Sequence, residues 1–281
     1  MVLADAYGCL LLDLDGVLYR GDEAVPGAPE TMASVRARGR SVVFITNNSS
    51  RTPEQVAAKL ERMGIPAAPS EVVTSALATA ELLAARGGGS AFVVGQDGLR
   101  SALEGAGIQV VSGEPDRADH VVVGFDATAD YAKLKHASLL VQRGAGLVAT
   151  NPDASFPSSD GLWPGAGALL AVITATTGAT AEVVGKPYAP LFETARRRAG
   201  GGVPLVVGDR IDTDIAGADA LGWDSLLVLS GVATRADVEA SNVQPTFVGD
   251  DISALVRESS PQRQKGPSGN VGVPGVPRRS R

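Results

Sequence analysis

Short runs of Val, Ile and Leu alternate with longer Ala-rich stretches along most of this 281-residue chain. Near-continuous apolar strands that alternate with helices are typical of parallel sheets, because each crossover lays a helix over a face of the sheet. We therefore predict an α/β fold with a Rossmann-like parallel sheet core and helices on both faces. The expected strands are Cys9–Leu14, Ser41–Ile45, Ala91–Gly95, His120–Gly124, Gly146–Thr150, Val203–Val207 and Ser225–Val228. The expected helices are Pro29–Arg38, Thr52–Met63, Ser75–Ala85, Gly98–Ala106, Tyr131–Arg143, Gly167–Gly178, Leu191–Ala199 and Thr213–Leu221.

Composition narrows the classes of partner. Hydrophobic residues make up 44% of the chain, enough for a full-sized core, and the net charge is −6. Five basic residues and no acid lie in residues 261–281, so the rest of the chain is more acidic than the total suggests. An acidic body argues against nucleic acid as a partner. It is compatible with a small phosphorylated metabolite, because a bound cation can reverse the local sign of charge.

The location of the protein is inferred from its cysteine and its apolar runs. Cys9 is the single cysteine, so no disulfide can form within the chain, which suits a reducing compartment. No apolar run is long enough to span a membrane, and the N-terminus lacks the pattern of a signal peptide. We expect a cytoplasmic protein with no membrane partner.

Two acids, Asp13 and Asp15, end the first apolar run and precede Gly16. Residues i and i+2 of a strand point to the same face, so both carboxylates are expected on one side of the strand tip. Crowded carboxylates repel each other unless a cation lies between them. The sequence therefore predicts a Mg²⁺ site at the carboxyl end of a central strand.

Polar motifs also follow two other predicted strands and the short apolar run Val183-Val184. A polar turn would explain any one of them, since Asn, Asp and Gly favour turns. Four such motifs at the carboxyl ends of parallel strands favour a functional site instead, because those ends lie at one edge of the sheet. The three motifs are Thr46-Asn47-Asn48-Ser49, Gly185-Lys186-Pro187 and Gly208-Asp209-Arg210.

The residue types match the needs of phosphoryl transfer. Aspartate is a known covalent nucleophile in this chemistry, and Asp13 fits that role. Asp15 could protonate the leaving oxygen and later deprotonate the attacking water. Mg²⁺ takes few protein carboxylates and keeps several waters, so Asp13 and Asp209 are its natural ligands.

Positive charge and hydrogen-bond donors would hold the phosphate. Thr46 and Asn47, with nearby main-chain N–H groups, can bind phosphate oxygens. Lys186 supplies a compact positive charge against the charge that develops in the transition state.

The acidic residues after Asp209, namely Asp212 and Asp214, could act either at the start of a helix or at the proposed site. Asp212 or Thr213 could cap the helix that follows, and we favour capping for Asp212. Asp214 could orient Lys186 or a metal-bound water, or it could be a plain acid at the start of a helix.

Taken in order, these motifs resemble the four motifs of the haloacid dehalogenase (HAD) superfamily. The resemblance covers about residues 7–250. The long insertion between the second and third motifs resembles the C2-type cap of the NagD-like, para-nitrophenyl phosphatase-like branch. The matching segments are Asp13-Leu14-Asp15-Gly16-Val17-Leu18, Thr46-Asn47-Asn48, Gly185-Lys186-Pro187, and Gly208-Asp209 with Thr213-Asp214.

The resemblance implies a role for each motif residue. Asp13 would be the nucleophile and Asp15 the general acid/base. Mg²⁺ would be bound by Asp13, Asp209 and the main-chain carbonyl of Asp15. Thr46 and Lys186 would hold the phosphoryl group, and Asp214 would belong to the outer shell of the metal.

The resemblance also divides the chain. The catalytic core would comprise residues 1–74 and 182–260, and the α/β cap residues 75–181. By analogy, two copies would form a homodimer through the cap. The remaining residues, 261–281, are rich in Gly, Pro, Ser and Arg without an apolar period, and this composition predicts a disordered basic tail.

Three residues are candidates for substrate specificity: Asn48, Asp153 and Phe156. In this branch the cap loop around Asn151–Gly165 would face the leaving group, although simple cap packing is an equal explanation for Phe156. The loop has no basic residue to bind a second anionic group. We therefore expect a small polyol phosphate such as glycerol phosphate, then phosphoglycolate, then sugar or nucleoside monophosphates.

The predicted function is Mg²⁺-dependent hydrolysis of a small phosphate monoester through an aspartyl-phosphate intermediate. Two alternatives stay open. A phosphotransferase or mutase would use the same phosphoenzyme with another hydroxyl in place of water, and a non-catalytic binding protein would keep only the fold.

Overall fold

The computed structural model describes residues 2–158, 160–258 and 264. The chain divides into two compact units. The first holds the residues up to Val42 together with those from Gly201 on, and the second is Val43–Gly200. The boundaries expected for core and cap, at residues 74/75 and 181/182, stay a prediction. The predicted disordered tail, residues 261–281, lies outside the described residues apart from Gln264.

The first unit is built on parallel strands in the order β15-β14-β13-β1. Leu11 of β1 lies opposite Val206 of β13, and every residue of these two strands is buried. The strands are β1 (Cys9–Leu12), β2 (Tyr19–Arg20), β3 (Glu23–Ala24), β13 (Pro204–Gly208), β14 (Asp224–Val228) and β15 (Phe247–Gly249). The helices are α1 (Ala28–Ala37), α8 (Ala216–Ala220) and α9 (Arg235–Ala240). Strand β4 (Ser41–Thr46) begins in this unit and continues into the second.

The second unit contains a five-stranded parallel sheet in the order β12-β9-β8-β6-β7. Its strands are β6 (Ser90–Val94), β7 (Gln109–Val111), β8 (His120–Val123), β9 (Gly146–Ala149) and β12 (Glu182–Val183). The unit also has β5 (Val72–Thr74), which pairs in parallel with β4, and the hairpin of β10 (Ser155–Ser158) and β11 (Gly161–Pro164). Its helices are α2 (Pro53–Arg62), α3 (Ser75–Ala85), α4 (Asp97–Gly105), α5 (Tyr131–Gln142), α6 (Ala166–Thr177) and α7 (Ala189–Arg198).

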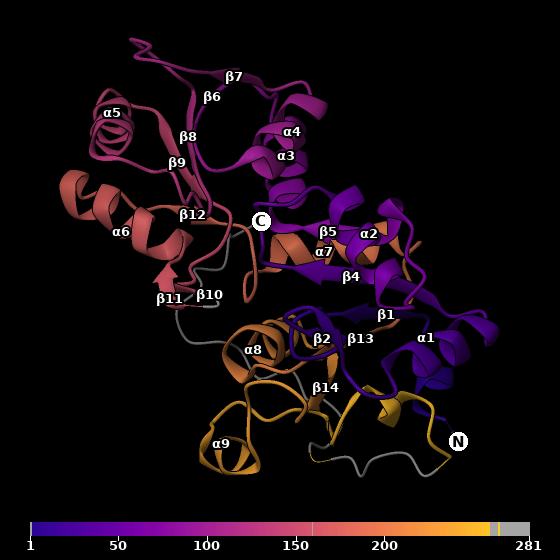
Figure 1. Ribbon diagram of the computed structural model, residues 1–281. Coiled ribbons are helices and arrows are strands. Elements are labelled where there is room, and N and C mark those ends of the chain that lie inside the picture. The colour runs from indigo at the N-terminus through magenta and orange to yellow at the C-terminus, as the bar shows by residue number, and fades with distance from the viewer. Residues whose placement is uncertain (1, 159, 259–263, 265–281) are drawn as a thin grey trace, which may run out of the picture. The chain divides into compact units, whose positions relative to one another are not determined.

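Helices cover the five-stranded sheet on both faces. Figure 1 shows α5 and α6 on one side and α3 and α4 on the other. Alternate residues of a strand share a face, so Phe92 and Val94 of β6 join Val121 and Val123 of β8 in one core cluster. Residues of α5 and α6, including Leu140 and Ile173, complete this cluster.

Side-chain caps explain where two predicted helices begin. At the start of α2, Thr52 Oγ1 accepts the Gln55 N–H at 3.3 Å and Gln55 Oε1 accepts the Thr52 N–H at 3.0 Å. This reciprocal capping box satisfies two donors that a helix start leaves unpaired. At the start of α5, Asp130 Oδ1 accepts the N–H of Lys133 at 2.7 Å and so satisfies one such donor.

Two predicted boundaries next to the polar motifs are wrong, and most of the others differ from the structure by one or two residues. Strand β1 ends at Leu12 rather than Leu14, because the chain turns: Leu14 O accepts the Leu18 N–H at 2.8 Å, and Gly16 has a φ of 78°. The predicted helix Thr213–Leu221 is instead a π-helical turn, Ile211–Ile215, followed by α8. The sequence prediction also missed the short strands β5, β7 and β15 and both hairpins.

The predicted α/β class is confirmed, since parallel sheets and crossover helices make up both units. In the described part of the chain, no helix combines the length and the apolar character that a membrane span needs.

Candidate active site

Three buried aspartates lie together in the first unit. Asp13 follows β1 and Asp209 follows β13, and these strands are parallel neighbours whose carboxyl ends lie at the same edge. Asp214 lies in the π-helical turn that follows. The carboxylates of the three residues offer oxygen atoms that all lie within 4.8 Å of one another. Their exposed fractions are 7%, 3% and 0%.

The chemistry of this group fits a divalent cation. Buried carboxylates at such short range repel each other, and a hard cation that prefers oxygen ligands relieves that repulsion. Glycines give the carboxylates room: a Cβ at Gly208 would lie 2.2 Å from Asp214 Cβ, and one at Gly16 would lie 2.2 Å from Asp209 Oδ2. These observations define a site for a divalent metal. Asp13 and Asp209, with Asp214 beside them, are the residues that would hold it.

The π-helical turn determines where Asp214 lies. Its Oδ2 accepts the Arg210 N–H at 3.3 Å and the Thr213 hydroxyl at 3.2 Å, so one carboxylate oxygen is fixed from within the turn. Asp212 points elsewhere and binds Arg210 at 2.7 and 3.0 Å, which lowers the pKa of Asp212 below its usual value. The interpretation of Asp212 as a helix cap is wrong, because Asp212 lies inside the turn Ile211–Ile215 rather than at the cap position of the turn or of α8.

Asp15 differs from Asp13 in its exposure. Asp13 is buried, whereas Asp15 is exposed and its Oδ2 accepts the Tyr19 hydroxyl at 3.3 Å. The turn through Gly16 accounts for this difference. An exposed carboxyl group can exchange protons with water, as a general acid/base must.

In the second unit, Thr46 ends β4 and Asn47 follows it. Thr46 is 5% exposed, and its Oγ1 accepts the Asn48 N–H at 3.1 Å. The side chain of Asn47 binds the main chain of Lys186 with both its oxygen and its nitrogen, and it also binds Asp153. The second and third motifs are therefore joined directly. Lys186 itself is 3% exposed.

Sequence reasoning gave no individual role to several residues that support these motifs. Asn47 O accepts hydrogen bonds from Ser75 Oγ and Asn151 Nδ2, both at 2.7 Å. Ser49 Oγ accepts the Thr150 hydroxyl at 3.2 Å. A signal was present, because Thr150 and Asn151 end a predicted strand just as Thr46 and Asn47 do.

The three specificity candidates each have partners in the second unit. Asn48 Oδ1 accepts the N–H and the hydroxyl of Ser50, at 2.9 and 2.7 Å, and so shapes its own turn. Asp153 Oδ2 accepts the Asn47 side-chain N–H at 3.1 Å. The Phe156 ring stacks on Phe125 with centroids 4.3 Å apart. Their contact with a substrate stays a prediction.

Comparison with known proteins supports the resemblance to the haloacid dehalogenase superfamily. The model of the haloacid dehalogenase-like hydrolase family matches residues 10–109, and that of the HAD-hydrolase-like family matches residues 183–255. The chain is 39% identical over 255 residues to an acid sugar phosphatase of Staphylococcus aureus (strain USA300), covering 90% of this chain and 98% of the relative.

Solved structures show the same similarity. Glycerol phosphate phosphatase Rv1692 from Mycobacterium tuberculosis, in complex with calcium, matches with a TM-score of 0.87 and 37% identity, over 92% of this chain and 77% of that one. The structure of 4-nitrophenylphosphatase from Thermotoga maritima matches with a TM-score of 0.83 and 34% identity, over 90% and 97% of the two chains.

The chain belongs to the haloacid dehalogenase-like hydrolase family. Within that family it is a phosphatase, and its relatives include the para-nitrophenyl phosphatases that the motifs predicted.

Proposed function

We propose that this phosphatase hydrolyses a small phosphate monoester with Mg²⁺ through a phosphorylated Asp13. The observation that carries the proposal is the group of three buried carboxylates, Asp13, Asp209 and Asp214. Asp13 and Asp209 would bind the ion together with the main-chain carbonyl of Asp15. Asp214 would act in the outer shell, since Arg210 and Thr213 already hydrogen-bond its Oδ2. The bound ion would screen the negative charges of substrate and carboxylates.

The reaction would proceed in two displacements at phosphorus. A carboxylate oxygen of Asp13 attacks the phosphorus while the ester P–O bond breaks and Asp15 gives a proton to the leaving oxygen. Water then attacks the phosphorus, Asp15 takes a proton from it, and the bond between Asp13 and phosphorus breaks. Inorganic phosphate leaves and both aspartates return to their initial states.

Thr46, Asn47 and Lys186 would bind the phosphoryl oxygens. Because the Asn47 side chain already binds Lys186 and Asp153, we assign phosphate binding to its main-chain N–H. The Thr46 hydroxyl and the Lys186 ammonium would supply the other donors.

For the substrate we propose a small polyol phosphate such as glycerol phosphate, with phosphoglycolate second and sugar or nucleoside monophosphates third. The name of the mycobacterial neighbour supports the first of these and that of the staphylococcal relative the third. The loop from Asn151 to Gly165 lacks a basic residue, which favours a neutral leaving group.

Phosphate release from a panel of monoesters tests the proposal. The panel would hold glycerol phosphate, phosphoglycolate, hexose phosphates, nucleoside monophosphates and para-nitrophenyl phosphate, each with Mg²⁺ or with EDTA. We expect release only with Mg²⁺, and the highest kcat/KM with glycerol phosphate. Beryllium fluoride with Mg²⁺ should mimic the phosphorylated aspartate and raise the melting temperature. Release that persists in EDTA would contradict the metal dependence.

The alternatives make different products. A phosphotransferase or mutase would give less inorganic phosphate and a new ester when an alcohol is added. The non-catalytic alternative is set aside, because the chain is a phosphatase.

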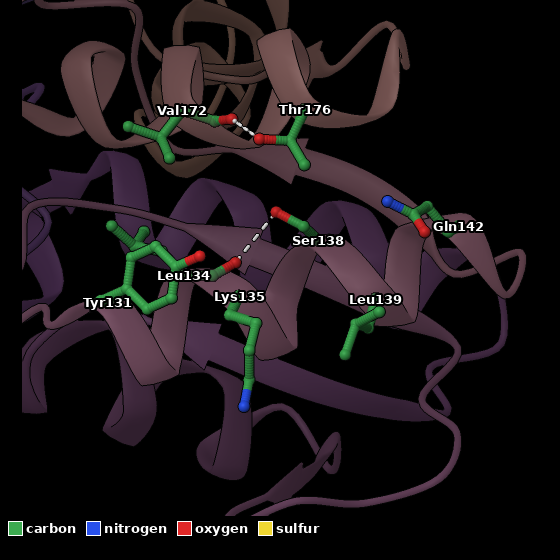
Figure 2. A pocket seen from close by; sticks show the side chains of 8 residues that line it. All are labelled: Tyr131, Leu134, Lys135, Ser138, Leu139, Gln142, Val172 and Thr176. Atoms are coloured by element: carbon green, nitrogen blue, oxygen red, sulfur yellow. Dashed lines mark hydrogen bonds between the residues drawn. The ribbon is translucent and has the colours of Figure 1, made fainter.

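We also propose a cytoplasmic protein that forms a homodimer through the cap. Support for the dimer comes from an exposed groove between α5 and α6, shown in Figure 2. Tyr131 and Val172 line it and are 84% and 45% exposed. Light scattering should show a dimer that Tyr131→Glu with Val172→Glu converts to a monomer. Val203→Glu, at a 66% exposed position in the first unit, should leave the dimer intact.

A further inference from the structure

The segment Ser230–Ala233, which follows β14, binds Asp209 through its main chain. The Val232 N–H donates to Asp209 Oδ2 at 2.8 Å, and the Ala233 N–H donates to Asp209 O at 3.0 Å. Main-chain donors are held by the path of the chain rather than by side-chain rotamers. The path of this segment therefore sets the orientation of the Asp209 carboxylate.

Gly231 allows the segment to lie against that carboxylate. A Cβ at this position would lie 1.9 Å from Asp209 Oδ2 and 2.4 Å from its Cγ, far inside van der Waals contact. The φ of Gly231 is outside the left-handed region, so no left-handed strain would oppose alanine there. Glycine is required here because the metal ligand is so close.

The same segment also holds the turn after β1. The Ser230 hydroxyl, in a buried position, donates to Gly16 O at 2.7 Å, and Arg20 Nε donates to Ser230 O. A Cβ at Gly16 would meet both Asp209 Oδ2 at 2.2 Å and Gly231 Cα at 2.9 Å. Gly16, Gly231 and the carboxylate of Asp209 therefore form one close contact.

We propose that Ser230–Ala233 is a positioning segment for the metal site, with Gly231 as its essential residue. It fixes the carboxylate of Asp209 and ties it to the turn that carries Asp15. The inference rests on the proposed function, since it assumes that Asp209 binds Mg²⁺. Groups that orient metal ligands typically change metal affinity about 10- to 100-fold when they are mutated.

Titration calorimetry of the full chain with Mg²⁺ tests this proposal. We expect Gly231→Ala to raise the Kd for Mg²⁺ at least about tenfold, while its circular dichroism and its melting in EDTA stay near those of the wild type. Gly105→Ala is the matched control, because a Cβ there meets nothing within 4 Å. It should bind Mg²⁺ like the wild type.

A second pair of variants covers the case in which Gly231→Ala does not fold. Ser230→Ala removes the hydroxyl that binds Gly16 and should weaken Mg²⁺ binding several-fold, whereas Ser230→Thr keeps the hydroxyl and should restore it. Wild-type Mg²⁺ affinity in folded Gly231→Ala, or in Ser230→Ala, would overturn the inference and leave the proposed function standing. A wild-type protein that binds no Mg²⁺ would overturn both.

Discussion

Asn47 binds both main-chain groups of Lys186. Its Oδ1 accepts the Lys186 N–H at 2.8 Å, and its Nδ2 donates to Lys186 O at 3.1 Å. The same Nδ2 donates to Asp153 at 3.1 Å. One amide side chain therefore fixes the backbone of the residue that we propose to contact the phosphoryl group.

We predict that Asn47→Ala lowers kcat/KM about 100-fold, because a shift of about 1 Å in a residue that positions substrate has an effect of that size. Asp153→Ala is the matched comparison, since it removes the Asp153 contact and keeps both hydrogen bonds to Lys186. It should lower kcat/KM less than about tenfold. Steady-state phosphate release checks both variants, and equal losses would show that the two bonds to Lys186 do not matter.

Asp13→Asn should lower kcat by at least about 10⁴-fold, because an amide cannot form the phosphorylated intermediate. Folding should be preserved, as the amide has nearly the shape of the carboxyl group. Asp212→Asn is the control in the same unit, because the side chain of Asp212 is 69% exposed and forms an ion pair with Arg210. It should retain activity within about twofold. Substantial activity in Asp13→Asn would show that Asp13 is not the nucleophile.

The first motif shows what sequence could and could not predict. Asp13 follows a fully apolar strand, so both its burial and its position beside Asp209 followed from the rule for parallel sheets. The difference between Asp13 and Asp15 did not follow, because it depends on where the strand ends. That end is set by the hydrogen bond from Leu18 to Leu14 and by the left-handed Gly16.

The second and third motifs show the same limit. The order of Thr46-Asn47 and Gly185-Lys186 along the chain predicted that both motifs bind the phosphoryl group. The sequence did not predict that the Asn47 side chain binds the main chain of Lys186, because these two residues are 139 positions apart. Such long-range contacts leave no local pattern, and the same is true of Gly231 beside Asp209.

Phe156 gives a test of substrate contact. We predict that Phe156→Leu changes the ratio of kcat/KM for para-nitrophenyl phosphate to that for glycerol phosphate by about threefold or more, since aromatic contacts contribute about 0.5–1.5 kcal/mol. Phe125→Leu removes the same stacked pair and keeps Phe156 in the loop. It should leave the ratio unchanged. A change of equal size in both variants would assign Phe156 to cap packing.

A buried ion pair in the second unit predicts how stability depends on pH. The side chain of Asp126 is 0% exposed, and its Oδ2 accepts from Lys133 Nζ at 2.7 Å. Burial raises the pKa of Asp126, whereas the hydrogen bonds from Lys133 and Thr128 lower it. The hydrogen bonds together outweigh burial, so the pKa lies below its usual value of 3.8. Folding therefore stabilises the ionised carboxylate. This contribution is present above about pH 4 and is lost as the pH falls through the lowered pKa.

Lys133→Met should reduce the free energy of unfolding at pH 7 by about 3 kcal/mol, because it leaves a buried carboxylate without its cation. The difference from the wild type should shrink as the pH falls through the lowered pKa of the wild-type Asp126, because a neutral carboxyl group no longer needs the cation. Arg117→Met changes an exposed basic residue elsewhere in the same unit and should stay within about 0.5 kcal/mol of the wild type at every pH. Urea unfolding between pH 3 and pH 7 checks this, and a difference that stays constant across that range would exclude the ion pair as its source.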